Sequence, residues 1–148
     1  MQERPGFLIR RLYQIHVALF LEECAPERMT PVQYSVLTAL DQMGTIDQAT
    51  LSRSVALDRT NVADVVARLE GRNLVTRRPS PEDGRKTLVS ITNEGCELLD
   101  RLEPAAMRAH ERTIAALPKH ERIQFLKTME YLVASAEQSN LLNGPGAL

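Results

Sequence analysis

From residue 58 to residue 92 the chain reads DRTNVADVVARLEGRNLVTRRPSPEDGRKTLVSIT. The first half has the period of a helix, because at 100° per residue its apolar side chains share one face. These side chains are Val62, Val65, Val66 and Leu69. The second half contains two β-branched, alternating runs around a segment of turn formers, which predicts a β-hairpin. We therefore expect a helix followed by a hairpin.

Asp58 is suited to cap this helix, which we expect to run to about Arg72. Just upstream, Asp47 is suited to cap a shorter helix over residues 48–55. The side chains on the outward face of the longer helix are small and polar. A short helix, a brief turn and a longer helix of this kind form the helix-turn-helix arrangement.

The expected hairpin strands are residues 74–78 and residues 87–91. The segment between them, PSPEDGRK at residues 79–86, is rich in turn formers and in charge. It predicts a long, charged tip.

Helices are also expected on both sides of this region. Residues 5–24 carry too many apolar side chains for one narrow stripe, so this helix should be buried on more than one side. Thr30 is suited to cap a second helix that has Pro31 at its first position and ends near Gly44.

Thr92 is suited to cap a long helix that reaches about Leu117, with Pro104 expected to kink it. A last helix begins at Pro118. Its broad apolar band comprises Ile123, Phe125, Leu126, Met129, Leu132 and Val133. The fold class is therefore mainly α with a small β-wing.

The composition excludes several classes of protein. The chain has 148 residues, of which 43% are hydrophobic and 25% charged, as in an ordinary globular unit. We recognise neither a signal peptide nor an apolar run long enough to span a bilayer, and two distant cysteines fit a cytoplasmic protein with reduced thiols. Since no catalytic, glycine-rich nucleotide-binding or metal-ligand motif is present, we expect no enzyme activity, cofactor or metal.

The net charge of −1 argues against a protein that coats nucleic acid indiscriminately. The charge is nevertheless uneven. Residues 51–92 contain eight basic and five acidic side chains, so the basic excess falls on the helix-turn-helix and hairpin. This distribution favours binding to DNA at one localised surface.

An ordered set of motifs resembles the MarR family of winged helix-turn-helix transcription regulators. The motifs are RLEGRNLV at residues 68–75, PEDGR at residues 81–85 and ITNEG at residues 91–95. Asn73 stands where the family most often has glycine, and Ile91 where it usually has leucine. The segment MTPVQY at residues 29–34 also resembles the family's entry to its second helix.

The resemblance implies an obligate homodimer that places two DNA-binding lobes on a pseudo-palindromic, double-stranded operator. It divides this single MarR-type unit into a winged helix-turn-helix lobe, residues 30–92, and a helical dimerisation region, residues 1–28 and 93–142. The apolar faces predicted for the first and last helices agree with this division. We expect a repressor, because a dimer on a promoter blocks polymerase.

The expected DNA contacts follow from side-chain chemistry and from position in the helix-turn-helix. Asn61 can pair with adenine, Thr60 can meet a thymine methyl and Asp64 can accept from a cytosine amine. Further contacts to bases or phosphates are expected from Thr50, Ser52, Arg59, Arg68, Arg77 and Lys86. An alternative role for Thr60 and Asn61 is to start the helix.

At the hairpin tip, the resemblance places the family's minor-groove arginine at Arg85, and a narrow minor groove attracts such a cation. Asp83 is expected to order the loop by pairing with an arginine, since a carboxylate facing phosphates would repel them.

Members of this family commonly respond to small anionic, often aromatic, effectors. By analogy, Arg10, Arg11, His16 and Tyr34 are candidates to bind a small aromatic acid or thioester. A partly exposed helix histidine and a core tyrosine, neither of which binds a ligand, would explain His16 and Tyr34 equally well.

Two alternatives remain open at the level of sequence. Oxidation of Cys24 could be the trigger, although the neighbouring acidic residues should raise its thiol pKa. A winged helix used only for protein contacts is the other. We expect Cys96 to be a small buried residue.

Overall fold

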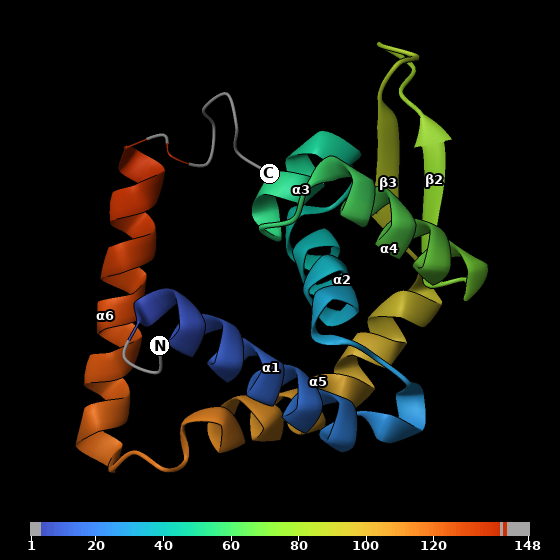
Figure 1. The fold of residues 1–148 in the computed structure, drawn as a ribbon. Coiled ribbons are helices and arrows are strands. Elements are labelled where there is room, and N and C mark those ends of the chain that lie inside the picture. The colour runs from blue at the N-terminus through green and yellow to red at the C-terminus, as the bar shows by residue number, and fades with distance from the viewer. Residues whose placement is uncertain (1–3, 140, 142–148) are drawn as a thin grey trace. The chain divides into compact units, whose positions relative to one another are not determined.

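The computed structural model describes residues 4–139 and residue 141 (Figure 1). The helices are α1 (Pro5–Glu23), α2 (Pro31–Met43), α3 (Gln48–Ser54), α4 (Arg59–Gly71), α5 (Asn93–Ile114) and α6 (Lys119–Gln138). A short 3₁₀ turn, η1 (Ala25–Glu27), follows α1. The strands are β1 (Ile46–Asp47), β2 (Val75–Pro79) and β3 (Thr87–Ile91). The prediction of a mainly α fold with a small β-wing is confirmed.

The chain forms two compact units, Met1–His110 and Glu111–Leu148. The first holds α1 to α4, the sheet and most of α5; the second holds the end of α5 and α6. The predicted division into a lobe of residues 30–92 and a dimerisation region remains a prediction.

The helix boundaries follow the capping signals in the sequence. At α2, the Gln33 N–H donates to Thr30 Oγ1 at 3.2 Å, and the Thr30 N–H donates to Gln33 Oε1 at 3.1 Å. This reciprocal pair is a capping box. The helix ends at Gly44, whose φ of 75° is accessible to glycine because it has no Cβ.

The sheet has three antiparallel strands in the order β1-β3-β2. The wing strands pair from Val75 opposite Ile91 to Pro79 opposite Thr87. The sequence did not indicate β1, because a strand of two residues has no periodicity. It pairs Ile46 with Val89 and thereby ties the wing to the start of α3.

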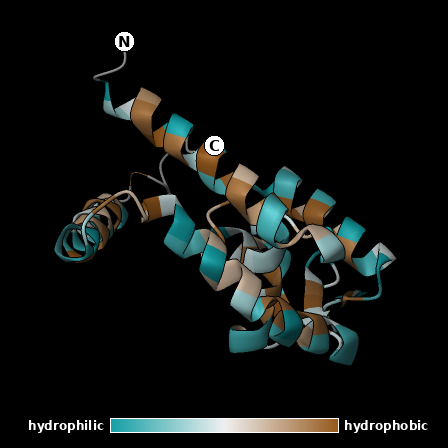
Figure 2. Cartoon of the chain, turned by 90° about the horizontal axis from the view of Figure 1, so that it is seen from below, coloured by the Kyte–Doolittle hydropathy of each residue, from teal (hydrophilic) through white to brown (hydrophobic). Residues whose placement is uncertain are grey.

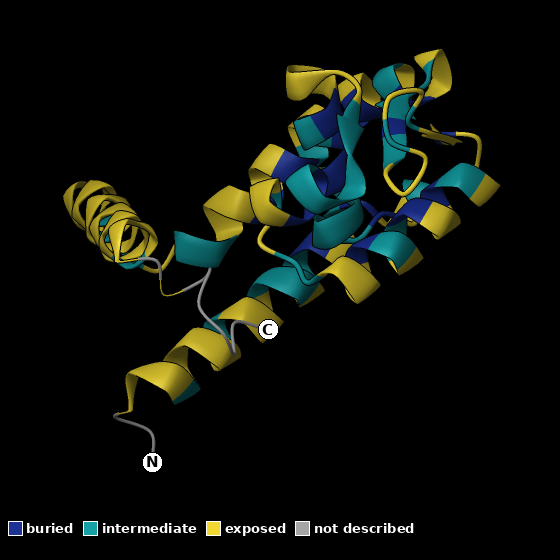
Figure 3. Ribbon diagram, turned by 90° about the horizontal axis from the view of Figure 1, so that it is seen from above, coloured by how far each residue is buried: buried dark blue, intermediate teal, exposed yellow. Residues whose placement is uncertain are grey.

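The hydrophobic core lies inside the first unit, as Figure 3 shows by its buried residues. Fully buried side chains come from all five helices of this unit, from the segment before α2 and from the sheet. They include Phe20, Met29, Leu37, Leu40, Leu51, Val62, Val66, Leu69, Val89 and Leu102. Each stabilises the fold by about 1.5–3 kcal/mol through removal of its apolar surface from water. The predicted inward face of α4 is confirmed by Val62, Val66 and Leu69.

The base of the wing is fixed to the start of α5. Thr92 Oγ1 donates to the Asn73 carbonyl at 2.7 Å and accepts from the Gly95 N–H at 3.0 Å. The Thr92 N–H donates to the Leu74 carbonyl at 3.0 Å. Asn73 itself takes a positive φ of 60°, which asparagine tolerates, so it replaces the more usual glycine here.

Helix α5 continues through Pro104 as one helix and ends at Ile114, three residues before the predicted end. Its buried face includes Leu98, Leu102 and Ala106. Cys96 is only partly buried, contrary to expectation, because it lies beside this face rather than on it. Its Sγ lies 3.7 Å from Asp41 Oδ1.

Apolar side chains remain exposed on α1 and on α6. Figure 2 shows them as brown patches along α1. Exposed large apolar residues include Leu8, Ile9, Tyr13 and Ile15 on α1, and Ile123, Leu126, Tyr131, Leu132 and Val133 on α6. In the part of the chain that the structure describes, α6 has no buried residue. The expectation that α1 is buried on several sides is therefore not met within one chain.

Candidate nucleic-acid interface and effector pocket

Helices α3 and α4 each begin with an aspartate cap that also holds a side chain of the predicted interface. Asp47 accepts from the Thr50 N–H at 2.9 Å and from the Thr50 hydroxyl at 2.8 Å, which lowers the pKa of Asp47. Asp58 accepts from the Asn61 N–H at 2.8 Å and from Asn61 Nδ2 at 2.6 Å. Thr50 and Asn61 therefore both take part in starting a helix.

The turn between α3 and α4 is held by Ser52 and Leu57. The Leu57 N–H donates to the Ser52 carbonyl at 3.0 Å, and the Ser52 hydroxyl donates to the Leu57 carbonyl. Ser52 is buried, so its hydroxyl serves the turn, and we do not retain it as a phosphate contact. Ala56, in the same turn, has a left-handed φ of 54°.

The outward face of α4 carries the residues that the sequence predicted for base reading. Arg59, Thr60, Asn61, Asp64 and Arg68 are all exposed. The opposite face is fixed in the core, so these side chains project from a helix whose orientation is set by packing. This is the geometry that a recognition helix needs.

The wing strand β2 is bonded to α4 through Arg77 and Glu70. Arg77 Nε and Nη2 donate to Glu70 Oε1 at 3.2 and 2.9 Å, and the Arg77 N–H donates to Glu70 Oε2 at 3.0 Å. These bonds lower the pKa of Glu70. The Arg77 guanidinium, predicted to contact DNA, is thus already paired within the lobe.

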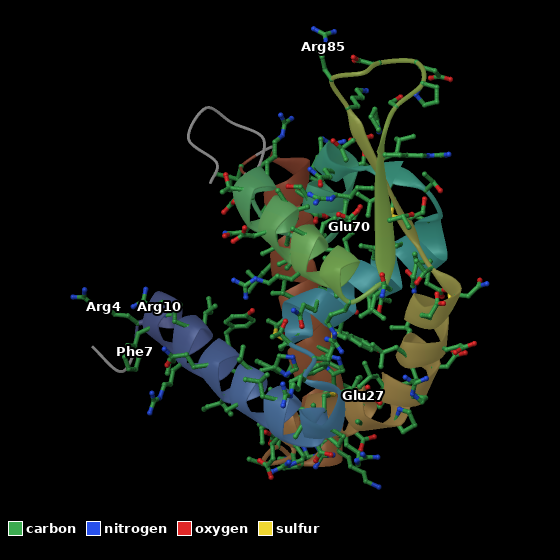
Figure 4. All side chains as sticks on the ribbon, turned by 90° about the vertical axis from the view of Figure 1, so that its right-hand side faces the viewer. Arg4, Phe7, Arg10, Glu27, Glu70 and Arg85 are labelled. Atoms are coloured by element: carbon green, nitrogen blue, oxygen red, sulfur yellow. The ribbon has the colours of Figure 1, made fainter. Side chains whose placement is uncertain are left out.

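The wing tip is ordered around Asp83. Asp83 Oδ1 accepts from the Arg85 N–H at 3.1 Å and from Arg85 Nε at 3.2 Å. The backbone closes the loop through Ser80 N–H to the Lys86 carbonyl at 2.8 Å and Lys86 N–H to the Asp83 carbonyl at 2.9 Å. The Arg85 side chain is 92% exposed and projects from the tip (Figure 4). The tip therefore presents a cation outward.

A cavity of about 390 Å³ lies in the first unit, between α1, α2, α5 and the α3–α4 turn. Its lining is His16, Phe20, Pro31, Tyr34, Ser35, Thr38, Ala39, Gln42, Ser54, Val55, Ala56 and His110. Four of these form an aromatic cluster. The His16 and His110 rings stack at 5.0 Å between centroids, and Phe20 lies 5.5 Å from Tyr34 and 6.0 Å from His16.

Two groups of the cavity have shifted pKa values. Burial, followed by repulsion from His110, lowers the pKa of His16. Burial and the hydrogen bond to Glu103 raise the pKa of Tyr34 to about 12. The Tyr34 hydroxyl donates to Glu103 Oε2 at 2.9 Å, so Tyr34 stays protonated.

The structure brings together two of the four predicted effector residues. His16 and Tyr34 both line the cavity, whereas Arg10 and Arg11 do not. Arg10 lies exposed near the N-terminal end of α1 (Figure 4), and Arg11 Nη1 donates to Gln14 at 3.4 Å. His110 was missed because nothing in the sequence links it to His16, which lies 94 positions earlier.

A second hollow, of about 440 Å³, borders α4. Asn61, Asp64 and Arg68 of α4 form one side, and Tyr13 and Val17 of α1 contribute another. The side of α4 that faces α1 is therefore accessible at the residues proposed to contact DNA.

Cys24 is buried, at 1% exposure. Burial and the neighbouring Glu23 raise its pKa, and Arg108 acts in the opposite direction. A redox sensor needs an accessible thiolate, so these features disfavour an oxidation trigger at Cys24.

Comparisons with known proteins agree with this geometry. A sequence model of the MarR family matches residues 29–87. The transcriptional repressor NicR of Pseudomonas putida is 34% identical over 137 residues, or 93% of this chain and 87% of NicR. The chain belongs to the MarR family.

Two solved structures of transcription regulators are similar to this MarR-family chain. One is BpsR of Bordetella bronchiseptica, described with the regulation of its DNA binding by 6-hydroxynicotinic acid. It has a TM-score of 0.82 and 31% identity and covers 90% of this chain and 95% of its own. The other is PcaV of Streptomyces coelicolor with its natural ligand, at a TM-score of 0.80 and 35% identity, covering 91% and 95%.

The residues that the structure describes contain no group of three or more side chains suited to hold a metal ion. Among the same residues, no helix is both long and apolar enough to cross a membrane. The relatives are transcription regulators rather than enzymes.

Proposed function

We propose that this MarR-family chain is a homodimeric repressor that binds a pseudo-palindromic, double-stranded operator. The observation that carries the proposal is the joint exposure of the α4 face and of Arg85, two elements that Glu70 and Arg77 hold together. A recognition helix reads the major groove while a cation on the wing suits a narrow minor groove. Such a protein works in the cytoplasm, where its operator lies.

In this proposal, Asn61, Thr60 and Asp64 meet base edges, because they lie near the N-terminal end of α4. Arg59, Arg68 and Lys86 are exposed cations suited to phosphates. The Thr50 hydroxyl donates its proton to Asp47 and so has no proton left to donate to a phosphate oxygen; we therefore assign Thr50 a supporting role through the Asp47 cap. Asp83 and Arg77 position the wing.

The exposed apolar faces support the homodimer. On α6, Ile123 is 60% and Leu132 61% exposed, and on α1, Ile9 is 67% exposed. Contiguous apolar surface of this kind marks an interface in a water-soluble protein. A second copy of the chain is the partner we propose, since two lobes are needed for two half-sites about 34–36 Å apart.

The effector proposed here is a small aromatic acid in the cavity beside the α3–α4 turn. The cluster of Phe20, Tyr34 and two histidines suits an aromatic ring. Because Ser54, Val55 and Ala56 form one wall, a ligand there would touch the helix-turn-helix itself. It would release the operator by favouring a spacing of the two α4 helices that does not fit the half-sites.

The direct test is operator binding at two salt concentrations. A labelled duplex from the gene's own promoter region is titrated by fluorescence anisotropy at 50 and 200 mM salt. A protein with 6–10 phosphate contacts loses about 10³–10⁵ in affinity over this range. A scrambled duplex of equal length is the control and should bind at least about 10³-fold more weakly. Affinity that is equal for both duplexes would contradict an operator.

A winged helix used for protein contacts predicts the opposite pattern. Binding to DNA would then be weak and non-specific. Sedimentation with a promoter duplex would show the free dimer at every molar ratio of protein to DNA. The effector proposal is checked separately by thermal shift with aromatic carboxylates, since a ligand that binds the folded state raises Tm. Without a shift for any of them, the aromatic-acid proposal fails while operator binding stands.

A further inference from the structure

Asn61 is held by Asp58 through its side chain as well as through its backbone. Asp58 Oδ1 accepts from the Asn61 N–H at 2.8 Å, and Asp58 Oδ2 accepts from Asn61 Nδ2 at 2.6 Å. A helix cap needs only the first of these bonds, because it is the backbone N–H that would otherwise lack a partner. Capping therefore does not account for the second bond.

The second bond fixes the orientation of the Asn61 amide. A carboxylate can only accept hydrogen bonds, so the amide group that faces Asp58 is the NH₂, and Oδ1 is turned away from it. In the opposite orientation Oδ1 would lie against the carboxylate, and two oxygens that only accept repel each other. Asn61 is exposed, and among the residues that the structure describes none donates a hydrogen bond to its Oδ1. This oxygen is therefore available to a ligand.

The fixed amide offers an acceptor, Oδ1, beside one remaining N–H donor. In the major groove adenine presents the complementary pair, since its N6 amine donates and its N7 accepts. Guanine presents two acceptors, N7 and O6, which an outward Oδ1 repels. Cytosine presents a single donor and would leave the N–H of the amide unpaired. The orientation of the Asn61 amide therefore favours adenine.

Asn61 lies where this preference can act on a base. It is the third residue of α4, and it borders the hollow of about 440 Å³ together with Asp64 and Arg68. Recognition helices contact base edges with the residues at their N-terminal end. Asp58 itself is partly buried at the cap, and both of its side-chain oxygens are bonded to Asn61. Asp58 therefore acts on a base through Asn61.

We propose that Asp58 is a positioning residue for base recognition, and that the Asn61 amide which it orients reads one adenine in each operator half-site. The inference rests on the proposed operator binding and deepens it, because it names a base and the residue that sets the preference. Without Asp58, the amide can turn its NH₂ toward the acceptors of guanine. A side chain that is already fixed also loses less conformational entropy when it binds.

An operator selected in vitro locates the adenine. Duplexes that bind wild-type protein are enriched from a random library, and each A·T pair of the enriched site is changed to G·C symmetrically in both half-sites. At one position per half-site, we expect this change to weaken wild-type binding at least about tenfold and Asn61→Ala binding less than about threefold. Replacing that adenine by 7-deazaadenine, which lacks the N7 acceptor, should likewise weaken binding of wild type and not of Asn61→Ala.

The selection separates this inference from the proposed function. If wild-type protein enriches no site, operator binding fails and the inference fails with it. If wild-type protein enriches a site but Asn61→Ala has the same base preferences, the inference is overturned while operator binding stands.

Two substitutions of Asp58 separate positioning from capping. Asparagine and serine both cap helices about as well as aspartate, so Asp58→Asn and Asp58→Ser should unfold within a few degrees of wild type. In Asp58→Asn the new NH₂ donates to Asn61 Oδ1 and turns the Asn61 NH₂ outward, so the preference for adenine over guanine should fall at least about tenfold or reverse. In Asp58→Ser the shorter side chain cannot hold the amide, so the preference should fall without reversing.

Asp47→Asn, at the start of α3, is the matched control. Asp47 caps its helix in the same way and also accepts from a side chain, that of Thr50. This substitution should change the affinity for the adenine duplex and for the guanine duplex by one common factor. An unchanged adenine preference in Asp58→Asn, or an equal loss of affinity for both duplexes, would show that the second bond only supports the cap and would overturn the positioning role.

Discussion

The Glu70 carboxylate on α4 accepts three hydrogen bonds from Arg77 on β2, two from the guanidinium and one from the backbone. This contact joins the helix proposed to read bases to the strand that carries the wing. The base of the wing is fixed separately, through Thr92 to Asn73 and Leu74. The angle between wing and helix is therefore set at two points.

The first prediction concerns Glu70→Gln, which keeps the shape of the side chain and removes its charge. We expect operator affinity to fall several-fold, because the wing is held less firmly, while the dimer stays intact. Arg77 lowers the pKa of Glu70 from its ordinary value of 4.5, so the pair stabilises the fold above that pH and this contribution is lost as the pH falls. The Tm difference between wild type and Glu70→Gln should therefore be present at pH 6 and vanish well below about pH 4.

Glu97→Gln, at an exposed position on α5, is the matched control. It should leave operator affinity and the pH profile of Tm unchanged. Equal operator affinity of Glu70→Gln and wild type would show that this contact does not position the wing.

The second prediction concerns Arg85→Ala at the wing tip. Since the side chain is 92% exposed and bonded only locally to Asp83, its removal should not affect folding. We expect operator affinity to fall at least about tenfold, in line with the loss of a minor-groove cation. Gel-shift titration measures the affinity, and sedimentation at the same concentration checks that the oligomeric state is unchanged. An affinity within twofold of wild type would remove Arg85 from the interface.

Most of the fold could be predicted from the sequence because its signals are local. Caps such as Thr30, Asp47 and Asp58 are seen in the chain itself, and each caps its helix in the structure. The strand β1 was missed because its two residues depend on a partner in β3, more than 40 positions away. The residue types within a short segment do not indicate a pairing with a distant strand.

The site was predictable as a set of residue types and less so as a set of roles. From the sequence, Arg77 is predicted to be a cation of the wing that contacts DNA. The structure shows that its guanidinium is paired with Glu70. Ser52 was predicted as a phosphate contact on α3, but its hydroxyl donates to the Leu57 carbonyl in the structure. His110 carries no signal in the sequence at all. In each case the missing information is a contact across the fold.

The third prediction concerns the two thiols. Cys24 is 1% exposed and Cys96 is partly exposed, so a thiol reagent should modify Cys96 first and Cys24 only on unfolding. Burial raises the pKa of both, so labelling at pH 7 should be slow and should accelerate with rising pH. Mass spectrometry after timed labelling identifies the site. Rapid modification or peroxide oxidation of Cys24 in the native protein would contradict this prediction and support the hypothesis that oxidation of Cys24 is the trigger.

The last prediction compares two glycine-to-alanine changes. A Cβ on Gly95 would lie 2.3 Å from the Leu74 carbonyl oxygen and 2.7 Å from Ile91 Cγ1, at the point where α5 meets the wing. The backbone must shift to admit it, so Gly95→Ala should destabilise the protein by about 3 kcal/mol. Gly71, at the end of α4, has nothing within 4 Å of such a Cβ, so Gly71→Ala should be neutral or stabilising by up to about 1 kcal/mol.

Thermal unfolding at one fixed protein concentration measures both variants, because the proposed dimer makes Tm depend on concentration. Gly95→Ala should unfold roughly 6–12 °C below wild type, given about 2–4 °C per kcal/mol for a protein of this size. Gly71→Ala should unfold within a few degrees of wild type. Equal Tm values for the two variants would show that the close approach of α5 to Leu74 does not constrain the wing, and that Gly95 can be replaced without cost.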